Sequence, residues 1–186
     1  MRRLTIGDTP IAGVKTIDRQ LFRDERGHFG RLFCAETLAE AGWPGPVVQI
    51  NESWTSRRGS LRGMHYQIPP HAESKLVTCI RGAVMDVAVD LRHGSPTLLG
   101  WHAETLSAEN GRALLLPPGC AHGFQALTDD VLLVYCHSAP YVPAADAGVQ
   151  PLDPRIGIRW PVPIADLSER DRNLPSLPAN YLGVRF

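Results

Sequence analysis

The sequence predicts an all-β fold of the jelly-roll class, and three observations lead to this prediction. The chain contains 17 glycines and 16 prolines among 186 residues, and both residue types interrupt helices. Short β-branched runs recur along the chain, with turns rich in Gly and Pro between them. There is no strand–helix–strand rhythm and no Gly-rich dinucleotide- or phosphate-binding motif, which disfavours a parallel α/β sheet. The length fits a single domain, residues 1–186.

The clearest pair of strands is Lys75–Cys79 and Ala83–Leu91, separated by the turn residues Arg81 and Gly82. In the second run, alternate residues fall on opposite faces, which is the period-two pattern of a strand. One of these faces carries Asp86 and Asp90, for which a structural role in the sheet and a contact with a ligand both remain open. A β-barrel of this size that holds a small ligand would use inward-facing polar side chains as its site.

The other predicted elements are short. Strands are expected at Thr16–Leu21, Val47–Glu52, Leu61–Gln67, Ala113–Leu116 and Val131–Cys136. Helical patterns are weak: one covers Glu36–Ala41, and Ser168–Arg172 can form a short turn with Ser168 as its N-cap.

The charge balance disfavours polyanionic partners. Lys and Arg total 19, as do Asp and Glu, so the chain has no bulk positive field to attract nucleic acid or an anionic membrane. Apolar runs have strand length, and the N-terminal stretch reaches Asp8 and Pro10 before any run of signal-peptide length. A cytoplasmic protein is therefore expected, with its cysteines as reduced thiols: Cys34, Cys79, Cys120 and Cys136.

Two histidine segments carry the first candidates for chemistry. His122 ends a P-x-G-x-x-H pattern that resembles a turn of cupin proteins, in which the histidine points into the barrel. His65 lies in Leu61–Gln67, and metal-binding cupins place a second histidine where this chain has Gln67. Because two histidines and a neutral amide form a poor ligand set for a transition metal, no metal site is predicted.

A buried histidine in a barrel can instead act as a general base that removes a proton from carbon. It then needs a carboxylate to orient it and, if the outcome is inversion, an acid on the other side of the carbon. Asp171 is a candidate for the carboxylate and Tyr135 for the acid. From the residues alone, both also fit structural roles, Asp171 as a helix cap and Tyr135 as a core residue of a strand.

A set of short segments, read in order along the chain, is more specific than any one motif. These segments are Asp24–Gly27, Gln49–Asn51, Leu61–Gln67, Lys75–Val77, Asp86–Arg92, Ser95–Thr97, Leu106–Asn110, Pro118–Phe124, Trp160–Pro161 and Leu167–Asp171. In this order they resemble the dTDP-4-dehydrorhamnose 3,5-epimerase family. The resemblance extends from about Asp18 to Pro175.

The resemblance implies a cupin-type jelly roll, a double-stranded β-helix, that forms a homodimer without cofactor or metal. It also implies a nucleotide-linked 4-keto-6-deoxyhexose as substrate, converted from dTDP-4-dehydro-6-deoxy-D-glucose to dTDP-4-dehydro-L-rhamnose for dTDP-rhamnose biosynthesis. C3 and C5 both adjoin the C4 ketone, so the loss of either proton gives an enolate delocalised onto one oxygen. Such chemistry needs no redox cofactor, which agrees with the missing dinucleotide motif.

The resemblance also implies individual roles. His65 matches the base, Asp171 the carboxylate that orients it and Tyr135 the acid on the opposite face. Lys75 matches a cation near the enolate oxygen, and Tyr141 matches an aromatic that stacks on the thymine ring. Further substrate contacts are implied at Arg26, Gln49, Asn51, Arg62, His122 and Arg170; arginine suits a diphosphate because its planar fork can bond two oxygens at once.

Three positions depart from the family pattern. Arg31 stands where the family carries a substrate-contacting Glu, Pro140 stands where a second Tyr is common before Tyr141, and Asp146 replaces a longer Glu. Arg31 and Asp146 are kept as candidate substrate contacts. None of the three touches the implied base and acid, so the departures concern the nucleotide and the sugar.

Several alternatives remain open at this point. A narrower relative would invert only C3 or only C5, or would act on another nucleotide deoxysugar in a secondary pathway. It would keep every proton-transfer residue. A non-catalytic sugar-binding cupin and a metal-dependent cupin dioxygenase are the alternatives from other functional classes.

Overall fold

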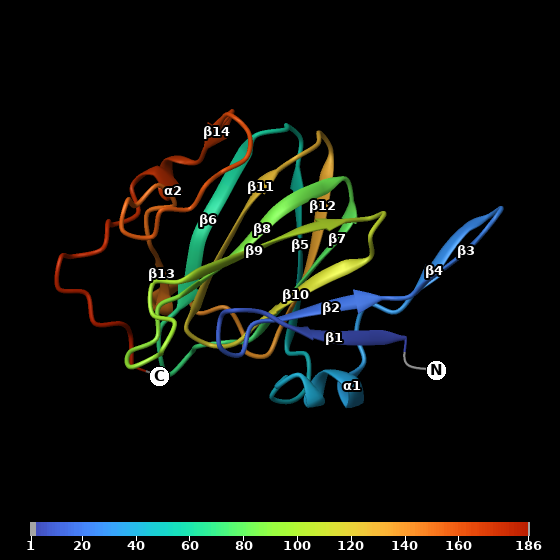
Figure 1. Cartoon of the computed structure of the whole chain (residues 1–186), viewed down its shortest axis with the longest axis horizontal. Helices are drawn as coiled ribbons and strands as arrows, with labels where there is room; N and C mark the ends of the chain where they lie inside the picture. The colour runs from blue at the N-terminus through green and yellow to red at the C-terminus, as the bar shows by residue number, and fades with distance from the viewer. Residues whose placement is uncertain (1–2, 186) are drawn as a thin grey trace.

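The computed structural model describes residues 3–185, which form two facing β-sheets, a projecting hairpin and two short helices (Figure 1). The first sheet has the strand order β1-β2-β10-β7-β12-β5. Its strands are β1 (Leu4–Asp8), β2 (Lys15–Arg19), β5 (Gln49–Thr55), β7 (Lys75–Arg81), β10 (Arg112–Leu116) and β12 (Val131–His137).

The second sheet has the order β13-β6-β11-β8-β9, and β14 pairs with β6 in parallel. Its strands are β6 (Ser60–Gln67), β8 (Ala83–Asp90), β9 (Trp101–Ser107), β11 (Cys120–Ala126), β13 (Asp146–Gly148) and β14 (Asp166–Leu167). The remaining elements are the hairpin β3 (Leu21–Asp24) and β4 (Gly27–Gly30), the helices α1 (Ala35–Glu40) and α2 (Glu169–Arg172), and a 3-10 turn, η1 (Pro143–Ala145).

The main core lies between the two sheets. Alternate residues of β7, β10 and β12 meet those of β8, β9 and β11, and Leu114, Phe124 and Leu133 are among the large side chains buried there. Fully burying such a side chain stabilises the fold by about 1.5–3 kcal/mol. Tyr135 packs against this core from one end, which places its phenol between the sheets.

Each sheet also has a covered outer face. On the first sheet, Leu38 of α1 and Trp43 pack over Ile17 and Leu76. On the second, the segment that follows β12 packs Val149, Ile156 and Leu177 against β6, β8 and β11. Strand β8 is consequently buried on both of its faces.

The predicted all-β class is confirmed, and the seven strands predicted from pattern are all present. Their ends agree with the prediction or differ by at most three residues, and the prediction at Thr16–Leu21 divides between β2 and β3. The sequence patterns missed β1, β4, β9, β11, β13 and β14. Strand β11, Cys-Ala-His-Gly-Phe-Gln-Ala, contains no β-branched residue and is a buried strand because it pairs with β6 and β8.

Both helical predictions are close to the observed elements. Helix α1 begins and ends one residue before the predicted Glu36–Ala41. Ser168 is the N-cap of α2, as predicted, and its hydroxyl accepts a hydrogen bond from the Asp171 N–H at 3.0 Å. Within residues 3–185, no helix is long and apolar enough to cross a membrane. All four cysteines are free.

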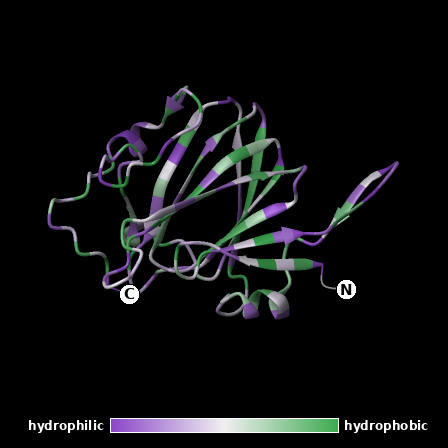
Figure 2. Ribbon diagram, viewed as in Figure 1, coloured by the Kyte–Doolittle hydropathy of each residue, from purple (hydrophilic) through white to green (hydrophobic). Residues whose placement is uncertain are grey.

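The β3–β4 hairpin projects from the two-sheet body (Figure 1). Its tip is hydrophilic, whereas the strands of the body carry most of the hydrophobic residues (Figure 2). Phe22 and Phe29 nevertheless face solvent on the hairpin, and the Arg3 guanidinium lies 5.6 and 5.8 Å from the centres of their rings. Arg23 pairs with Glu109 at 3.1 Å.

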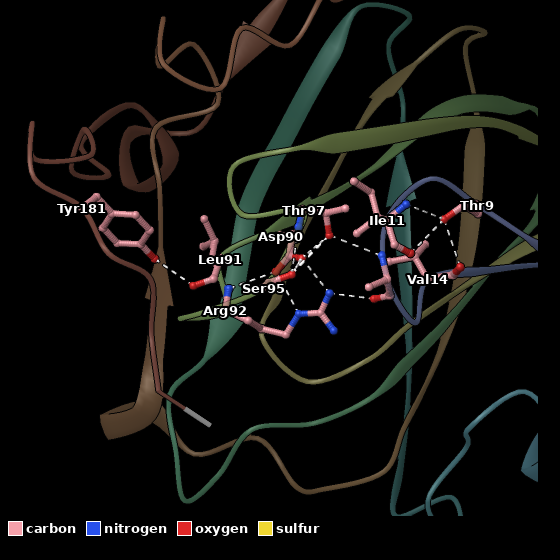
Figure 3. A network of polar contacts seen from close by, with 10 residues as sticks. Thr9, Ile11, Val14, Asp90, Leu91, Arg92, Ser95, Thr97 and Tyr181 are labelled. Carbon is pink, nitrogen blue, oxygen red and sulfur yellow. Dashed lines mark hydrogen bonds and ion pairs between the residues drawn. The ribbon is translucent and has the colours of Figure 1, made fainter.

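A buried polar network fixes the end of β8 and the turn that follows it (Figure 3). The Asp90 carboxylate is fully buried and accepts hydrogen bonds from the Arg92 guanidinium at 2.7 and 2.8 Å. It also accepts the hydroxyls of Ser95 and Thr97, at 2.5 and 2.6 Å. Arg92 in turn donates to the Ala12 carbonyl at 2.6 Å and so ties this turn to the loop between β1 and β2.

We expect Asp90→Asn to destabilise the fold by about 3 kcal/mol, because it leaves Arg92 without its buried counter-ion. This loss corresponds to a fall of roughly 6–12 °C in the melting temperature of a protein of this size. Glu109→Gln is the control, because its ion pair with Arg23 is exposed and should contribute little. Equal melting temperatures of the two variants would show that the network does not carry this stability.

The same carboxylate predicts how stability depends on pH. Burial acts to raise the pKa of Asp90, but hydrogen bonds from Arg92, Ser95 and Thr97 outweigh it and lower the pKa from 3.8 to about 2. A group whose pKa is lower in the folded state stabilises the fold above its unfolded pKa. We therefore expect wild type to lose about 2 kcal/mol between pH 4 and pH 2 from this group, a loss that Asp90→Asn should lack.

Candidate active site

A cavity of about 680 Å³ opens between the two sheets, at the end of the core where Tyr135 lies. Strands β6 and β11 supply one wall, and β5, β7 and β12 supply the other. Residues of β14 and α2, with Ser168 between them, complete the lining. Eight of the candidates named from the sequence line this cavity: Asn51, Arg62, His65, Lys75, His122, Tyr135, Arg170 and Asp171.

His65 and Asp171 form a hydrogen-bonded pair in this cavity. His65 lies on β6 and Asp171 in α2, and the His65 Nε2 atom is 2.6 Å from Asp171 Oδ1. The other carboxylate oxygen of Asp171 accepts the backbone N–H of Gly63 at 3.1 Å. Asp171 is buried, whereas 28% of the His65 side chain is exposed. The pair therefore has a fixed carboxylate and an accessible imidazole.

The environment keeps Asp171 ionised. Burial acts to raise the pKa of its carboxyl group, but the hydrogen bonds from His65 and Gly63 outweigh burial and hold the pKa below its ordinary value. An ionised carboxylate can only accept hydrogen bonds, so the proton between the two groups is on His65 Nε2. In the neutral imidazole, Nδ1 is then the basic nitrogen.

Tyr135 lies on β12, in the wall opposite His65. Its ring meets the His122 ring edge to face at 5.7 Å between centres and stacks on His137 at 6.1 Å. Removal from water raises the pKa of the Tyr135 phenol, and the nearby Asp86 carboxylate raises it further. The phenol is consequently a proton donor at neutral pH.

A second histidine–carboxylate pair lies beside this phenol. His122 Nε2 is 2.7 Å from Asp86 Oδ1, and both side chains are buried. The other oxygen of Asp86 is buried with no hydrogen-bond partner among residues 3–185. The sequence left a structural role and a ligand contact open for Asp86. The structure shows that its carboxylate bonds to the His122 ring. The signal in the sequence was an acidic residue among apolar ones on a face of β8 that packs inward.

Lys75 of β7 lines the cavity and forms an ion pair with Glu73, a residue that the sequence patterns did not indicate. Its ammonium group is 2.9 Å from a carboxylate oxygen of Glu73 and donates to the His65 carbonyl at 3.4 Å. Both side chains are largely buried. Glu73 also accepts a hydrogen bond from the Gln67 amide at 2.7 Å, so Gln67 orients polar groups behind the site.

A smaller cavity of about 150 Å³ shares part of this lining. It brings in three more candidates: Gln49, Tyr141 and Asp146. The Gln49 side chain accepts the Tyr141 N–H at 2.9 Å, and Asp146 pairs with Arg170 at 2.5 Å. Half of Tyr141 is exposed, so its ring is available to a ligand at the mouth.

His137 was missed in the sequence patterns, because the predicted strand ended at Cys136. Strand β12 continues by one residue, which places His137 on the same face as Tyr135. Burial, helped by the charge of Lys75, lowers the pKa of His137 to about 4, so its ring is neutral at neutral pH. Its Nε2 is 3.4 Å from the Asn51 amide nitrogen.

Two candidates lie elsewhere. Arg26 and Arg31 line neither cavity: Arg26 is at the tip of the projecting hairpin, paired with Asp24 at 2.6 Å, and Arg31 follows the hairpin beside Cys34. The structure therefore does not bring either residue to the site of its own chain.

The donor set of the cavity is also relevant to metal binding. Within residues 3–185, no group of three or more His, Cys, Asp and Glu side chains is arranged to hold a metal ion. His65 and His122 lie opposite each other on neighbouring strands, but each is bonded to its own carboxylate. The prediction of a metal-free site stays a prediction.

Comparison with known proteins identifies a single family. Residues 8–179 match the family model described as dTDP-4-dehydrorhamnose 3,5-epimerase. A dTDP-4-dehydrorhamnose 3,5-epimerase of Sinorhizobium fredii is 45% identical over 172 residues, which cover 90% of this chain and 86% of that protein. A dTDP-4-dehydro-6-deoxyglucose 3-epimerase of Streptomyces bikiniensis is 42% identical over 177 residues, which cover 94% of this chain and 90% of that protein.

A solved structure gives the same result for the fold. The dTDP-6-deoxy-D-glucose-3,5-epimerase of Legionella pneumophila, in complex with dTDP-4-keto-L-rhamnose, superposes with a TM-score of 0.90 at 37% identity. The match covers 98% of both chains. The predicted cupin-type jelly roll is confirmed by this likeness.

Proposed function

Since this chain belongs to the dTDP-4-dehydrorhamnose 3,5-epimerase family and is a nucleotide-sugar epimerase, we propose that it inverts both C3 and C5 of dTDP-4-dehydro-6-deoxy-D-glucose. The product would be dTDP-4-dehydro-L-rhamnose. One observation carries the proposal: a carboxylate-bound imidazole and a protonated phenol face the same cavity from opposite walls. Inversion at carbon requires a proton to leave from one face and to return from the other.

His65 is the base in this mechanism. The carbon-bound proton next to the C4 ketone passes to the imidazole, and the C–H electron pair becomes the enolate. The imidazolium that forms is stabilised by the Asp171 carboxylate at 2.6 Å. Because Asp171 is itself held by Gly63 and by the N-cap of α2, the imidazole is oriented before substrate binds.

Tyr135 is the acid. Its O–H proton passes to the opposite face of the enolate carbon, which reforms the ketone and leaves a phenolate. The raised pKa of Tyr135 keeps the proton on the phenol until the strongly basic enolate carbon is present. His65 loses its proton to solvent, and Tyr135 regains one before the next inversion.

Lys75 stabilises the negative charge that develops on the enolate oxygen. Its ammonium group lines the cavity within 3.4 Å of the His65 carbonyl, close to where the proton leaves. A cation placed where negative charge develops lowers the barrier more than one that merely binds the ground state. Glu73, at 2.9 Å, fixes the position of this ammonium group.

The nucleotide end would lie toward the mouth. Arg62 and Arg170 are exposed there and supply positive charge for a diphosphate. Tyr141 and Gln49 line the adjoining cavity, where the ring of Tyr141 can stack on a base. The relative from Legionella pneumophila was solved with a dTDP-linked sugar, which supports the same ligand class for this chain.

Inversion at C3 alone is the second candidate. The 3-epimerase of Streptomyces bikiniensis is 42% identical, close to the 45% of the 3,5-epimerase of Sinorhizobium fredii. Both reactions need the same base and acid, so the proton-transfer residues favour neither. The distinction depends on whether the substrate can present C5 as well as C3 to His65.

Deuterium uptake tests the proposal directly. In heavy water with dTDP-4-dehydro-6-deoxy-D-glucose, we expect one deuteron at C3 and one at C5, with the L-rhamno configuration in the product, as read by NMR and mass spectrometry. A reaction without enzyme corrects for spontaneous exchange. Uptake and inversion at C3 alone would replace the proposal with the second candidate, and no uptake would overturn both. Activity that survives a chelator supports the metal-free mechanism.

The proposal includes a homodimer as the state of the enzyme. Arg26 and Arg31 lie outside the cavity of their own chain, on and beside a hairpin that projects from the body. If they contact substrate, as the family pattern implies, the substrate must be bound by a second copy. The exposed rings of Phe22 and Phe29 give this hairpin an apolar surface for such a contact.

A further inference from the structure

The inner face of the first sheet holds a histidine that the proposed mechanism does not use. Strand β12 lies between β5 and β7, and His137 is paired with Gln49 on one side and with Lys75 on the other (Figure 1). Its side chain lines both cavities, and its ring stacks on that of Tyr135. His137 therefore lies beside the acid of the reaction and beside the cation assigned to the enolate oxygen.

A chain of hydrogen bonds determines which ring nitrogen of His137 carries the proton. Its first link is the backbone N–H of Tyr141, which can only donate and which bonds to Gln49 Oε1 at 2.9 Å. The Gln49 amide nitrogen is then the atom that faces Asn51, and it donates to Asn51 Oδ1 at 3.1 Å. This turns the Asn51 amide nitrogen toward His137 Nε2, at 3.4 Å. Because an amide nitrogen can only donate, Nε2 is the acceptor.

A neutral imidazole that accepts at Nε2 carries its proton on Nδ1. Burial lowers the pKa of His137 to about 4; the charges of Lys75 and His122 act in the same direction, and that of Glu73 opposes them. The ring is therefore uncharged at neutral pH. Its Nδ1 atom has no hydrogen-bond partner within residues 3–185 and is not fully buried, which leaves an N–H donor in the lining of the cavity.

The position of Lys75 shows where this donor can act. Residues directly opposite each other on neighbouring antiparallel strands have Cβ atoms about 4.5–5.5 Å apart, and His137 and Lys75 form such a pair. The Lys75 ammonium group is oriented by Glu73 and by the His65 carbonyl, which leaves the His137 N–H as a second, separate donor. The two groups can therefore donate to one oxygen atom of a ligand.

The proposed reaction supplies such an oxygen. When a proton leaves C3 or C5, negative charge collects on the oxygen at C4, and preorganised donors aimed at that oxygen lower the barrier. A neutral imidazole can polarise a carbonyl group by donating its N–H while a base removes the neighbouring proton. Because the imidazole is uncharged, it does not repel the Lys75 ammonium group beside it, whereas an imidazolium would.

We propose that His137 is a further catalytic residue, which donates its Nδ1–H to the C4 oxygen of the sugar together with Lys75. The contact is a hydrogen bond, and the proton stays on Nδ1. The chain from Tyr141 through Gln49 and Asn51 holds the imidazole in the tautomer that this role requires. The inference rests on the proposed epimerase function, because that reaction places the charge on the C4 oxygen.

The tautomer can be measured in the wild-type protein without substrate. In protein labelled with ¹⁵N at histidine, we expect the His137 ring at neutral pH to show a protonated Nδ1 and an unprotonated Nε2 in long-range ¹H–¹⁵N correlation spectra. His137→Phe identifies the signals, because they are absent from its spectrum. A proton on Nε2 or on both nitrogens would overturn the inference, whatever the protein does to a sugar.

His137→Phe removes the donor but keeps a ring against Tyr135. We expect kcat to fall about 10²-fold, as for the loss of one oxyanion donor. KM should stay within a few fold, because the contact strengthens only as charge develops on the oxygen. Deuterium uptake should fall with turnover, since enolate formation itself is slowed. His71→Phe is the matched control: His71 is exposed and lines neither cavity, so its turnover should equal that of wild type.

His137→Asn tests the donor itself, because its amide nitrogen can take the place of Nδ1. This variant should turn over at least about tenfold faster than His137→Phe, in keeping with the recovery of one hydrogen bond to a charged oxygen. Equal rates of the two variants would mean that the N–H of His137 is not what the reaction uses.

Other results would overturn the inference in distinct ways. Loss of inversion with uptake retained in His137→Phe, as expected of Tyr135→Phe, would mean that His137 only holds the phenol in place. Weaker dTDP binding by calorimetry with unchanged kcat would mean that the donor bonds to the diphosphate. Both outcomes leave the proposed function intact. Absence of uptake by wild type would instead remove the proposed function, and the role of His137 in it.

Discussion

Replacing His65 with Asn should reduce turnover by about 10³-fold, because general acid–base catalysis contributes roughly 10²–10⁴-fold to rate. The amide is close to the imidazole in size but cannot accept a carbon-bound proton at neutral pH. Deuterium uptake at C3 and C5 should fall with turnover, since both exchanges begin at the same base. The comparison of initial rates and of uptake by NMR measures this effect.

Binding of dTDP should be kept in the same variant, because the groups assigned to the nucleotide end lie at the mouth of the cavity and do not include His65. His71→Asn provides a matched control: His71 is exposed and lines neither cavity, so its turnover should equal that of wild type. Turnover of His65→Asn within a few fold of the control would contradict the assignment of His65 as the base.

The same pair shows how far sequence patterns reach. His65 was a candidate from its strand, and Asp171 from its place behind a Ser cap, but 106 positions separate them along the chain. Periodicity describes neighbours within one element and contains no information on which elements meet. Only the resemblance to a family connected His65, Asp171 and Tyr135, and the structure then placed all three in one cavity.

Local patterns were most reliable where burial and propensity agree. Strand β8 alternates between two cores and was predicted within one residue of its end. Strand β9, Trp101–Ser107, was missed because its residues are mixed in polarity and mostly half-buried. Its strand conformation follows from pairing with β8, which is a tertiary effect.

The least predictable residues of the site were those that contact other side chains of the site. Glu73 and Asp86 are single acidic residues in short segments, and each has meaning only through a partner, Lys75 or His122.

Tyr135→Phe should separate the two halves of the reaction: inversion should fall by about 10²-fold while deuterium uptake stays within a few fold of wild type. His65 can still remove the proton, and its partly exposed side chain can exchange that proton with solvent and return a deuteron to the same face. Phe keeps the ring contacts with His122 and His137, so the cavity wall should be preserved.

Tyr181→Phe is the control for this substitution, because Tyr181 donates to the Leu91 carbonyl on the outer side of the second sheet and does not line the cavity (Figure 3). The measurement is the ratio of deuterium uptake to inverted product, followed by NMR in one sample. In wild type, every inversion introduces one deuteron at the inverted carbon. In Tyr135→Phe, uptake should exceed inversion, because a deuteron returns to the enolate carbon from the same face from which the proton was removed. If uptake and inversion fell together, the phenol would be needed to form the enolate, and a donor other than Tyr135 would have to return the proton.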